Sequence, residues 1–288
     1  MEGRMLKRFL LCVFAASLVV ALRADEDVLR PKGRPEPSSG PPTQGIVRGP
    51  WALGVELGGS LSFFGQDVTQ YQAPTYQTNL TSGSGLGPLL NLAVDYALTD
   101  ALGIQARLGY DQKHFTTSGY LDSPCETPPG SGLFIPTRVE HTTSQTIAYW
   151  TGGVALRYRF EENWMILAGA TYHSRSNASF TETDSITSGT CQFYDDAGFP
   201  IGQRRQESGS NTSAFNAARW SVDLSVGYRI PLSENIVFLP RLAGQIFLNP
   251  LAGDNLSSGY HPVLGQVYAF TNRRLHALQL LLGLWFNL

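Results

Sequence analysis

The sequence predicts an all-β protein made of eight amphipathic strands, and three observations support this prediction. Apolar and polar residues alternate in eight segments, as in "WSVDLSVGYRI" at 220–230, which is the period of a strand with two unlike faces. The connections between these segments alternate between short and long. None of the eight segments carries Asp, Glu, Lys or Arg on its apolar face.

Two segments at the N-terminus are expected to lie outside the folded domain, which would span residues 50–288. Residues 1–24 hold three bases near their start, then an apolar run and small residues, which is the composition of a secretory signal peptide. An uncleaved anchor helix is the alternative. Residues 25–49 are polar and rich in proline, so we expect a disordered segment there. The net charge of −2 gives no reason to expect a nucleic-acid partner.

The predicted strands and their connections follow a regular order. The strands are 51–64, 89–98, 102–113, 149–160, 164–175, 220–230, 236–248 and 276–288. The short connections are 99–101, 161–163 and 231–235, and the long ones are 65–88, 114–148, 176–219 and 249–275. Parts of the long connections, such as "TRVEHTTSQTIA", look like strand extensions. Pro240 has no amide donor, so a bulge or irregularity is expected near it.

The apolar face is predicted to meet lipid. A cation at the lipid-facing midplane costs roughly 2–4 kcal/mol, which explains the charge exclusion, although a soluble sandwich would show the same exclusion with its faces reversed. Glycines such as Gly54 and Gly103 lie on the polar face, which suits a narrow lumen. The last strand finishes at the C-terminus, where pairing with the first strand would remove a free edge. We therefore predict a closed eight-stranded antiparallel up-and-down transmembrane β-barrel.

Aromatic residues on the apolar face lie at the two ends of the strands, as in the aromatic girdles of membrane barrels. Pairs of Trp and Tyr eight residues apart recur in three strands. One predicted girdle contains Trp51, Tyr96, Tyr158, Trp164, Tyr228 and Phe286, and the other contains Tyr110, Trp150, Tyr172 and Trp220.

Charged residues on the polar face are predicted to form an ion-pair network in the lumen. Its members are Glu56, Asp95, Arg107, Arg157, Asp223, Arg229 and Arg241. The favoured pairing joins Glu56 to Arg107 or to Arg241. Such a network could act as a gate, or it could be a plug whose polar groups satisfy one another, and we favour the plug.

The chain is similar to the eight-stranded outer-membrane barrels of Gram-negative bacteria, the class of the OmpA transmembrane domain and OmpX. The resemblance covers about residues 50–288 and includes the terminal segment "LLLGLWFNL", which resembles the signal read by the barrel assembly machinery. Members usually end in Phe, whereas Leu288 is last here. The resemblance implies a bacterial outer-membrane location, with residues 25–49 in the periplasm, and contacts with lipid, lipopolysaccharide and the assembly machinery.

The sequence contains no motif that predicts catalysis, a cofactor or a metal site. It lacks G-x-S-x-G, zinc-ligand spacing and a phosphate loop, and the neighbours His173 and Ser174 face opposite sides of a strand. Cys125 and Cys191 could form a disulfide or remain as two loop thiols. Several loop arginines could meet lipopolysaccharide phosphates at the outer rim or simply be solvated: Arg204, Arg205, Arg219, Arg273 and Arg274.

We expect a monomer without enzymatic activity. Its expected role is structural or adhesive, through long extracellular loops that mix Tyr with Ser, Thr, Asn and Gln and could bind an extracellular ligand. A narrow porin-like channel for small solutes is the alternative.

Overall fold

The computed structural model describes residues 50–70, 80–126, 130–161, 163–195, 197–210, 212–253, 255–261 and 265–288. The predicted signal peptide at 1–24 and the proline-rich segment at 25–49 lie outside the described residues. No helix within the described ranges is long and apolar enough to cross a membrane.

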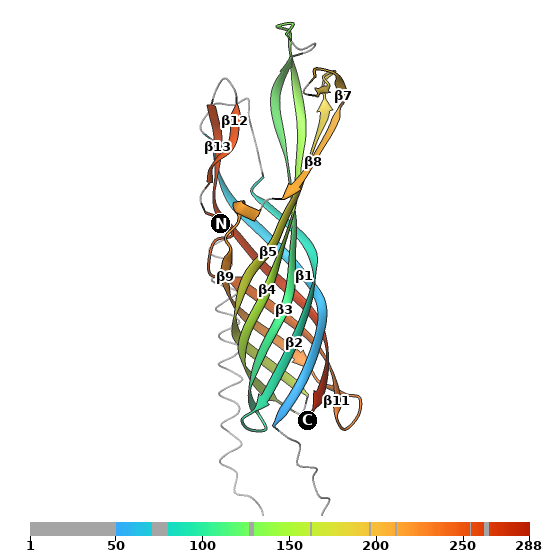
Figure 1. Ribbon diagram of the computed structural model, residues 1–288, viewed down its shortest axis with the longest axis vertical. Helices are drawn as coiled ribbons and strands as arrows, with labels where there is room; N and C mark the ends of the chain where they lie inside the picture. The colour runs from blue at the N-terminus through green and yellow to red at the C-terminus, as the bar shows by residue number, and fades with distance from the viewer. Residues whose placement is uncertain are drawn as a thin grey trace, which may run out of the picture. The chain divides into compact units, whose positions relative to one another are not determined.

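Eight long strands form a ring in chain order. Each strand is antiparallel to the next, and the last strand pairs with both the seventh and the first, so the ring is complete. The prediction of an eight-stranded antiparallel barrel is confirmed. The strands are β1 (Trp51–Gln70), β2 (Ser82–Ala97), β3 (Leu102–Glu126), β4 (Phe134–Phe160), β5 (Trp164–Ser188), β9 (Ala218–Tyr228), β11 (Ile236–Phe247) and β13 (Gly265–Asn287) (Figure 1).

Short elements occupy the connections. We call the end of the barrel with the short connections the turn end, and the opposite end the loop end. The short elements are β6 (Phe193–Tyr194), β7 (Pro200–Gly202), β8 (Arg204–Ser210), the 3-10 helix η2 (Thr212–Ala214), β10 (Ile230–Pro231) and β12 (Asn255–His261).

The predicted strand boundaries hold at the turn end and fall short at the loop end. At the turn end, β3 begins at Leu102 and β4 ends at Phe160, as predicted. At the loop end, β3 continues to Glu126 and β4 already begins at Phe134. Much of the predicted loop is therefore strand, because the ladder continues where the apolar alternation stops, and the predicted strand extension "TRVEHTTSQTIA" at 137–148 is confirmed as part of β4.

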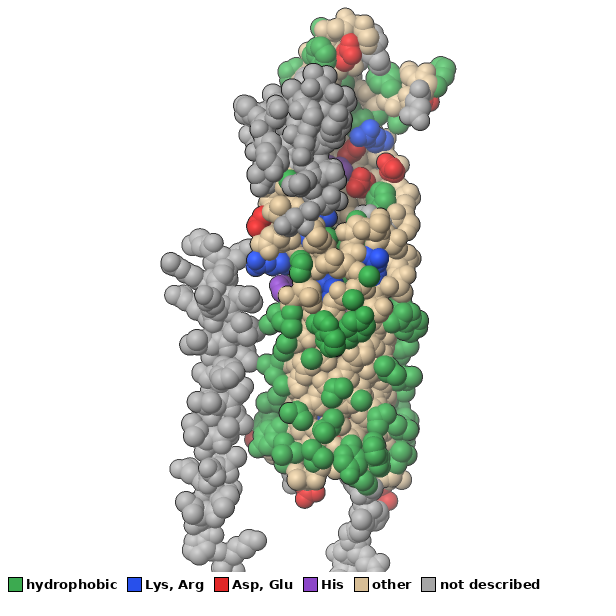
Figure 2. Space-filling model, turned by 60° about the vertical axis from the view of Figure 1, so that its left-hand side comes forward, with side chains coloured by type: hydrophobic (Ala, Val, Ile, Leu, Met, Phe, Trp, Pro, Cys, Tyr) green, Lys and Arg blue, Asp and Glu red, His purple; other side chains and the backbone are tan. Residues whose placement is uncertain are grey.

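The wall of the barrel shows why the alternation is strict. Side chains of β9 are exposed and buried in turn from Ala218 to Tyr228, with Leu224 outward and Asp223 inward. Apolar side chains therefore cover the outside of the wall, as Figure 2 shows, while charged side chains gather toward the loop end. An outer surface of this kind is stable only where hydrocarbon replaces water.

Pro240 causes an irregularity, but not in its own strand. β11 keeps a regular register with β13 through Pro240. The pairing of β11 with β9 begins only at Arg241. On the other side of this ladder, β9 ends at Tyr228, Arg229 belongs to no strand, and β10 begins at Ile230. A proline without an amide donor fits this gap in the ladder.

Beyond the barrel, three long strands continue as a second region that we call the loop-end sheet. It consists of residues 117–126 of β3, 134–148 of β4, 177–188 of β5, and β8. The β4–β5 register shifts between Ala148 and Tyr149, where the Ser176 hydroxyl donates to the carbonyl of Ala148 at 3.1 Å. A bulge bends its strand, so it lets the loop-end sheet diverge from the ring (Figure 1).

Candidate functional site

The lumen contains an ion pair at the position that the sequence predicted. Arg241 Nη2 lies 2.6 Å from Glu56 Oε2, and Arg241 Nη1 donates to Gln105 Oε1 at 3.0 Å. Asn91 Nδ2 also donates to Glu56, at 3.3 Å. Glu56 and Arg241 are each only 1% exposed, so each charge depends on the other for compensation.

Four of the five other predicted network members pair in different combinations, and the fifth, Arg229, lines a cavity at the turn end. Arg107 contacts Asp223 at 3.0 Å rather than Glu56, and Thr171 donates to the same carboxylate. Arg157 contacts Asp95 at 2.8 Å near the turn end. The network therefore consists of separate pairs at successive depths.

Two lumen residues that we had not assigned to the network also belong to it. Lys113 lies 2.7 Å from Asp111 and 2.6 Å from the hydroxyl of Ser60. Gln279 donates to the same aspartate at 3.0 Å. Asp111 and Lys113 stand two apart in one strand, so they share a face, and this spacing was the available signal.

A buried histidine lies next to a serine, but the arrangement is not that of a nucleophilic triad. His173 Nε2 is 2.9 Å from Ser221 Oγ, and that hydroxyl donates to Asp223 at 2.9 Å. The aspartate contacts the serine rather than orienting the imidazole, and both His173 and Ser221 are fully buried. The described residues contain no group of His, Cys, Asp and Glu suited to a metal ion.

An apolar cluster fills the loop end of the lumen. Phe64 stacks on Phe115 with ring centroids 4.4 Å apart, and Leu275 and Leu251 are fully buried beside them. Phe215 joins the cluster from the segment after η2. Sequence reasoning missed this cluster, because Phe115, Phe215, Leu251 and Leu275 fell in the predicted loops and Phe64 is the last residue of its predicted strand.

Two connecting segments cover the loop end of the lumen. The amide of Asn216 donates to the carbonyl of Leu251 at 3.0 Å, and the amide of Leu251 donates to Arg273 at 2.8 Å. Arg219 donates to the carbonyl of Asn249 at 3.0 Å and stacks 3.9 Å from the ring of Phe247. The expectation that Arg219 lies at the outer rim is therefore wrong: it is fully buried beneath this cover.

Two small cavities lie among the described residues of the lumen. One cavity near the turn end has a volume of about 30 Å³, and a second, among Arg107, Asp111 and Gln279, has about 20 Å³. Each is room for one to a few water molecules. At these two levels the described side chains leave little free space, as expected for a barrel of this strand number.

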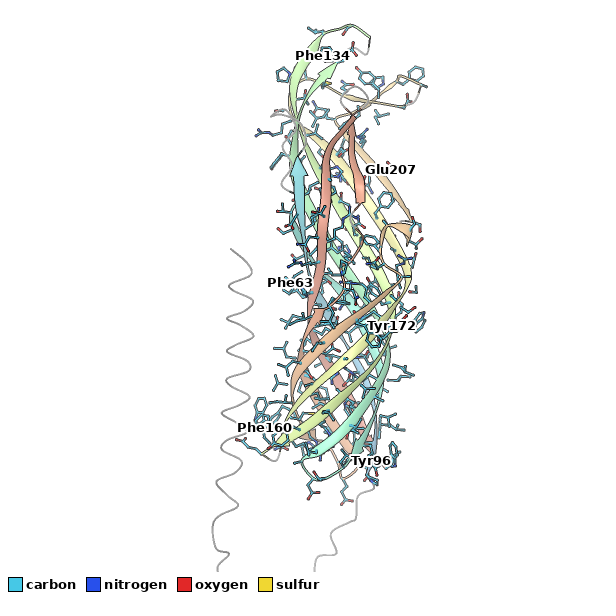
Figure 3. All side chains as sticks on the ribbon, turned by 90° about the vertical axis from the view of Figure 1, so that its left-hand side faces the viewer. Phe63, Tyr96, Phe134, Phe160, Tyr172 and Glu207 are labelled. Atoms are coloured by element: carbon cyan, nitrogen blue, oxygen red, sulfur yellow. A yellow bond between two sulfur atoms is a disulfide. The ribbon has the colours of Figure 1, made fainter. Side chains whose placement is uncertain are left out.

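Aromatic side chains pair along both rims of the apolar wall. Figure 3 shows Tyr96 and Phe160 near the turn end, with Phe63 and Tyr172 further toward the loop end. Contacts across neighbouring strands give ring-centroid distances of 4.6 Å for Trp51–Tyr96, 5.0 Å for Trp164–Tyr228, 5.4 Å for Tyr110–Trp150 and 5.1 Å for Tyr172–Trp220. The remaining predicted girdle residues, Tyr158 and Phe286, occupy outward positions near the turn end.

The loop-end sheet carries a disulfide between Cys125 and Cys191, which are 66 residues apart in sequence. It joins the end of β3 to the segment before β6. Thr137 donates to Cys191 at 3.3 Å, and the sulfur is fully buried. The link therefore ties the β3–β4 hairpin to the connection that follows β5.

A charged cluster lies in the same sheet, well beyond the apolar wall. Asp184 contacts His141 at 2.5 Å and Arg205 at 2.7 Å. The hydrogen bond to Asp184 raises the pKa of His141, although burial opposes this change. Burial favours a higher pKa for Asp184, but the hydrogen bonds from His141 and Arg205 outweigh it and lower the pKa.

The sequence matches a family described as the outer membrane protein beta-barrel domain, over residues 37–246. The chain belongs to this family. It is thus an outer-membrane β-barrel protein, and the resemblance seen in the sequence is confirmed at the level of the family. None of the curated proteins matches the chain.

Solved outer-membrane structures resemble this outer-membrane β-barrel at low similarity. Ail, the attachment invasion locus protein of Yersinia pestis, is 10% identical, with 82% of this chain and 98% of that chain covered and a TM-score of 0.31. OprG from Pseudomonas aeruginosa is 8% identical, with 84% and 97% covered and a TM-score of 0.33. OmpT, an outer membrane protease from Escherichia coli, is 11% identical, with 85% and 99% covered and a TM-score of 0.31. Scores this low carry no functional argument.

Proposed function

We propose that this protein is a non-catalytic outer-membrane protein whose loop-end sheet contacts a partner outside the cell. The observation that carries the proposal is a set of exposed apolar side chains at the tip of the β3–β4 hairpin and in the adjoining β6–β7 segment, which the Cys125–Cys191 disulfide ties together. Phe134 and Leu133 are 61% and 58% exposed, and Phe199 and Ile201 are 67% and 49% exposed. Large apolar side chains grouped in a water-facing region mark interaction sites.

The edge of the loop-end sheet supports the same proposal. Every residue of β8, Arg204–Ser210, is exposed, and among the described strands β8 pairs with β5. A strand edge of this kind can accept an extended segment of a partner through main-chain hydrogen bonds. Arg204 adds an exposed positive charge on this strand.

The rigidity of the sheet also favours a binding role. Long ladders continue from the barrel, and the disulfide fixes the β3–β4 hairpin relative to the following connection. A preorganised surface loses less conformational entropy when it binds.

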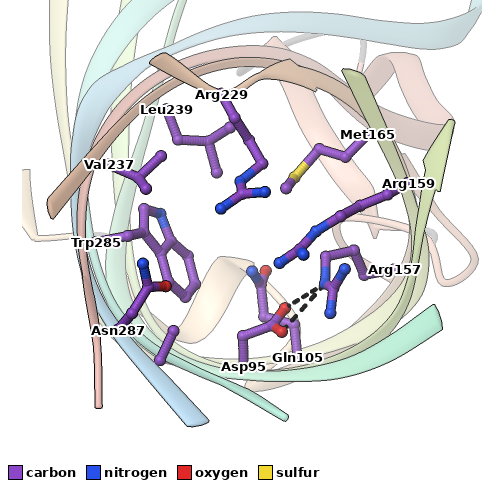
Figure 4. Close-up of a pocket in the computed structure, with 11 residues that line it drawn as sticks. Asp95, Gln105, Arg157, Arg159, Met165, Arg229, Val237, Leu239, Trp285 and Asn287 are labelled. Atoms are coloured by element: carbon purple, nitrogen blue, oxygen red, sulfur yellow. Dashed lines mark hydrogen bonds and ion pairs between the residues drawn. The ribbon is translucent and has the colours of Figure 1, made fainter. Parts of the chain in front are cut away.

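The lumen, by contrast, supports a structural role. Four ion pairs join buried charges in the lumen, an apolar cluster occupies its loop end, and two of its cavities measure about 30 and 20 Å³, the first of which is drawn in Figure 4. These features argue for a plug rather than for the porin-like channel, and the contacts of His173 argue against nucleophilic catalysis.

We further propose the orientation and partners. The turn end faces the periplasm, where residues 25–49 follow cleavage of the signal peptide at 1–24. The wall contacts outer-membrane lipid and lipopolysaccharide, and the final strand is recognised by the barrel assembly machinery. The protein is a monomer, because the ring leaves no wall strand unpaired.

Adhesion of intact cells tests the proposed function. Bacteria displaying the full chain would be compared with bacteria displaying Phe134→Ser/Phe199→Ser for attachment to a cultured epithelial monolayer and to a lawn of the same bacteria. We expect bacteria displaying the wild-type chain to attach more than bacteria without the protein in at least one of the two assays. Bacteria displaying the double variant should lose most of this increase in attachment. The matched control is Leu98→Ser/Leu232→Ser, which replaces two leucines that are 53% and 60% exposed in the short connections at the turn end.

Bilayer conductance of the purified protein provides the opposing test. We expect no stepwise conductance above a protein-free bilayer. Two results together would favour the channel over the contact role: reproducible stepwise conductance of the wild type, and attachment that is the same for the wild type and for the Phe134→Ser/Phe199→Ser variant.

A further inference from the structure

The strand β8 forms an edge of the loop-end sheet. Among the described strands, β5 is the one that pairs with β8, and every residue of Arg204–Ser210 is exposed. The pairing with β5 keeps one register along the whole of β8, without a bulge, and β8 contains no proline. Bulged or proline-containing edges resist pairing with a further strand, whereas a regular edge of this kind can accept one.

The backbone of β8 presents hydrogen-bonding groups to this edge at every second residue. The amide of Ile186 in β5 donates to the carbonyl of Gln203 at 2.8 Å, so the backbone of Gln203 faces β5. The facing direction alternates along an antiparallel strand, and Arg205 and Glu207 therefore also face β5. The backbone of Gln206, between them, faces outward. Its amide and carbonyl are oriented to begin a ladder with another strand.

The charged side chains make β8 complementary to itself. Arg205 and Glu207 are two residues apart and thus lie on the same face of the sheet. When a second β8 pairs antiparallel with Gln206 opposite its own copy, Arg205 of each chain lies opposite Glu207 of the other. These positions form the closely spaced, non-hydrogen-bonded pairs of the ladder, where opposite charges attract most effectively.

Other registers over the charged part of β8 lack this match. A pair centred on Arg204 or Arg205 sets two arginines opposite each other, and one centred on Glu207 sets two glutamates opposite each other. A pair centred on Ser208 brings no opposite charges together. The register centred on Gln206 also fits the backbone, because residues that face outward then lie opposite residues that face outward.

In the single chain, Glu207 lies opposite another acid. The register of β5 with β8 places Glu182 directly across from it, and like charges in that position repel. Figure 3 shows Glu207 in the loop-end sheet, beyond the wall residue Tyr172. Arg205 contacts Asp184 through its Nε at 2.7 Å, and its side chain remains 59% exposed. A second guanidinium beside Glu207 would offset the repulsion between the two acids.

The direction of the strands determines where the second copy lies. β5 runs from the turn end to the loop end, and β8 is antiparallel to it. Two chains in one membrane point the same way, so their β8 strands cannot pair antiparallel. Two chains in membranes that face each other point in opposite directions, so their β8 strands can. Each membrane then contains monomers, and the pairing joins two surfaces.

We propose that β8 pairs with β8 of a second copy of this chain on a facing outer membrane. The two strands form an antiparallel ladder centred on Gln206, with an Arg205–Glu207 ion pair on each side of the centre. Main-chain hydrogen bonds provide the attraction, and the charges select the register and the partner. One short ladder binds weakly, but many copies on facing surfaces act together. This pairing presupposes the proposed contact role of the loop-end sheet, because it supplies a partner for that region.

Clustering of vesicles tests the pairing of the wild type. The full chain is reconstituted in phosphatidylcholine vesicles that carry one of two dyes, and particles that contain both dyes are counted after mixing. We expect protein-bearing vesicles to cluster with one another and not with protein-free vesicles. Absence of clustering would overturn the proposal. Equal clustering with protein-free vesicles would make lipid the partner and would also overturn it.

Charge reversal tests the register. Glu207→Arg sets positive charges opposite each other in the paired strands, and Arg205→Glu sets negative charges opposite each other. For each variant alone, the protein density needed for clustering should rise at least about tenfold. Vesicles with Glu207→Arg mixed with vesicles with Arg205→Glu regain both ion pairs and should cluster like the wild type. Glu234→Arg, an exposed charge reversal at the turn end, is the control and should change nothing.

A proline tests the ladder without changing charge. Gln206→Pro removes the central outward amide and leaves the pairing with β5 in place, so it should abolish clustering. Unchanged clustering by this variant, or a mixture of folded charge variants that does not cluster, would overturn the proposal. Folding is checked by heat-modifiable gel migration. If Arg205→Glu does not fold, because it loses Asp184, then Glu207→Arg and Gln206→Pro decide.

The tip variant separates this proposal from the proposed function. Phe134→Ser/Phe199→Ser leaves β8 unchanged, so vesicles that carry it should cluster like the wild type. Tip-dependent attachment of cells, combined with vesicles that do not cluster, would overturn the second copy as partner and leave the contact role. Vesicles that cluster through β8, combined with cell attachment that is unaffected by the tip substitutions, would leave the pairing and overturn the tip as the contact surface.

Discussion

The barrel wall and the loop-end sheet are built by the same strands, yet their side chains obey different rules. In the wall, outward residues such as Leu224 are apolar and inward residues such as Asp223 are polar. In the loop-end sheet, residues 179–186 of β5 are half-buried without alternation, and Thr and Ser are common. Hydrogen-bond ladders run through both regions. The difference shows that the medium around a strand, rather than its pairing, sets its sequence pattern.

The two regions should respond differently to mutation. Changes in the wall or the lumen should lower the stability of the whole barrel, whereas changes in the loop-end sheet should stay local, because that sheet adds few contacts to the lumen. The following experiments test this difference, from the largest expected effect to the smallest.

Removing one buried charge in the lumen should have the largest effect. Glu56→Gln leaves Arg241 buried without its counter-charge, and such a loss costs about 3–5 kcal/mol. Urea unfolding in lipid vesicles, followed by tryptophan fluorescence, measures the change. The same substitution at the exposed Glu207 of β8 is the control and should change stability by less than about 0.5 kcal/mol. Equal losses of unfolding free energy for Glu56→Gln and Glu207→Gln would contradict the expected difference between the lumen and the loop-end sheet.

A charge on the lipid-facing wall should be the next most costly change. Leu224 lies midway between Trp220 and Tyr228 on the outward face, so Leu224→Arg places a cation near the bilayer centre. The expected loss is about 2–4 kcal/mol in the same vesicle assay. Leu133→Arg, at the tip of the loop-end sheet, makes the same chemical change in water and should be nearly neutral. A neutral Leu224→Arg would mean that the wall does not face hydrocarbon.

Loss of the disulfide should act only on the loop-end sheet. We expect Cys125→Ser/Cys191→Ser to lower the local opening free energy by roughly 2 kcal/mol, the low end of the usual range, because β3 and β5 on either side of the link are already held together by their pairing with β4. Hydrogen exchange of residues 134–140 should increase while the wall strands keep their protection. Increased exchange throughout β9 and β11 would show that the two regions unfold together.

The smallest expected effect is the pH dependence of the His141–Asp184 contact. The pKa of His141 is raised above 6.5, so its contribution is complete below that value and is lost as the pH rises through the raised pKa. The pKa of Asp184 is lowered below 3.8, so its contribution is complete above 3.8 and is lost as the pH falls through the lowered pKa. The contact should therefore be strongest between pH 3.8 and 6.5.

The two side chains are 19% and 13% exposed, and the cost of their desolvation offsets much of the ion-pair energy, so the contribution should be about 1 kcal/mol or less. Hydrogen exchange in β5 and β8, corrected for intrinsic rates, should slow when the pH falls from 8 toward 6. His141→Gln should abolish the dependence, and a variant with the wild-type profile would contradict the assignment.

The sequence predicted the wall well and the loop-end sheet poorly, for one physical reason. Lipid forces an outward face that excludes charge, so residues such as Leu224 and Trp220 give a periodic signal. A strand with water on both sides can carry charged residues on either face. The sequence therefore shows little apolar alternation where β3 continues to Glu126 and where β4 begins at Phe134.

The inside of the barrel was predictable in kind but not in detail. Alternation placed Glu56 and Arg241 inward, and the structure joins them. It could not show that Arg107 reaches Asp223, because partners across the lumen depend on strand tilt and register. Nor could it reveal Phe64 on Phe115, since inward aromatic residues beyond the girdle have no distinctive spacing.

The continuity of β3, β4 and β5 from the turn end to the loop-end sheet has a mechanical consequence. Tension applied to the tip would run along strand axes, while the ladder hydrogen bonds of antiparallel strands lie across them. Many bonds would therefore be loaded in shear at once instead of opening one by one. Any pull from outside the cell would reach the membrane-embedded cylinder without crossing a flexible joint.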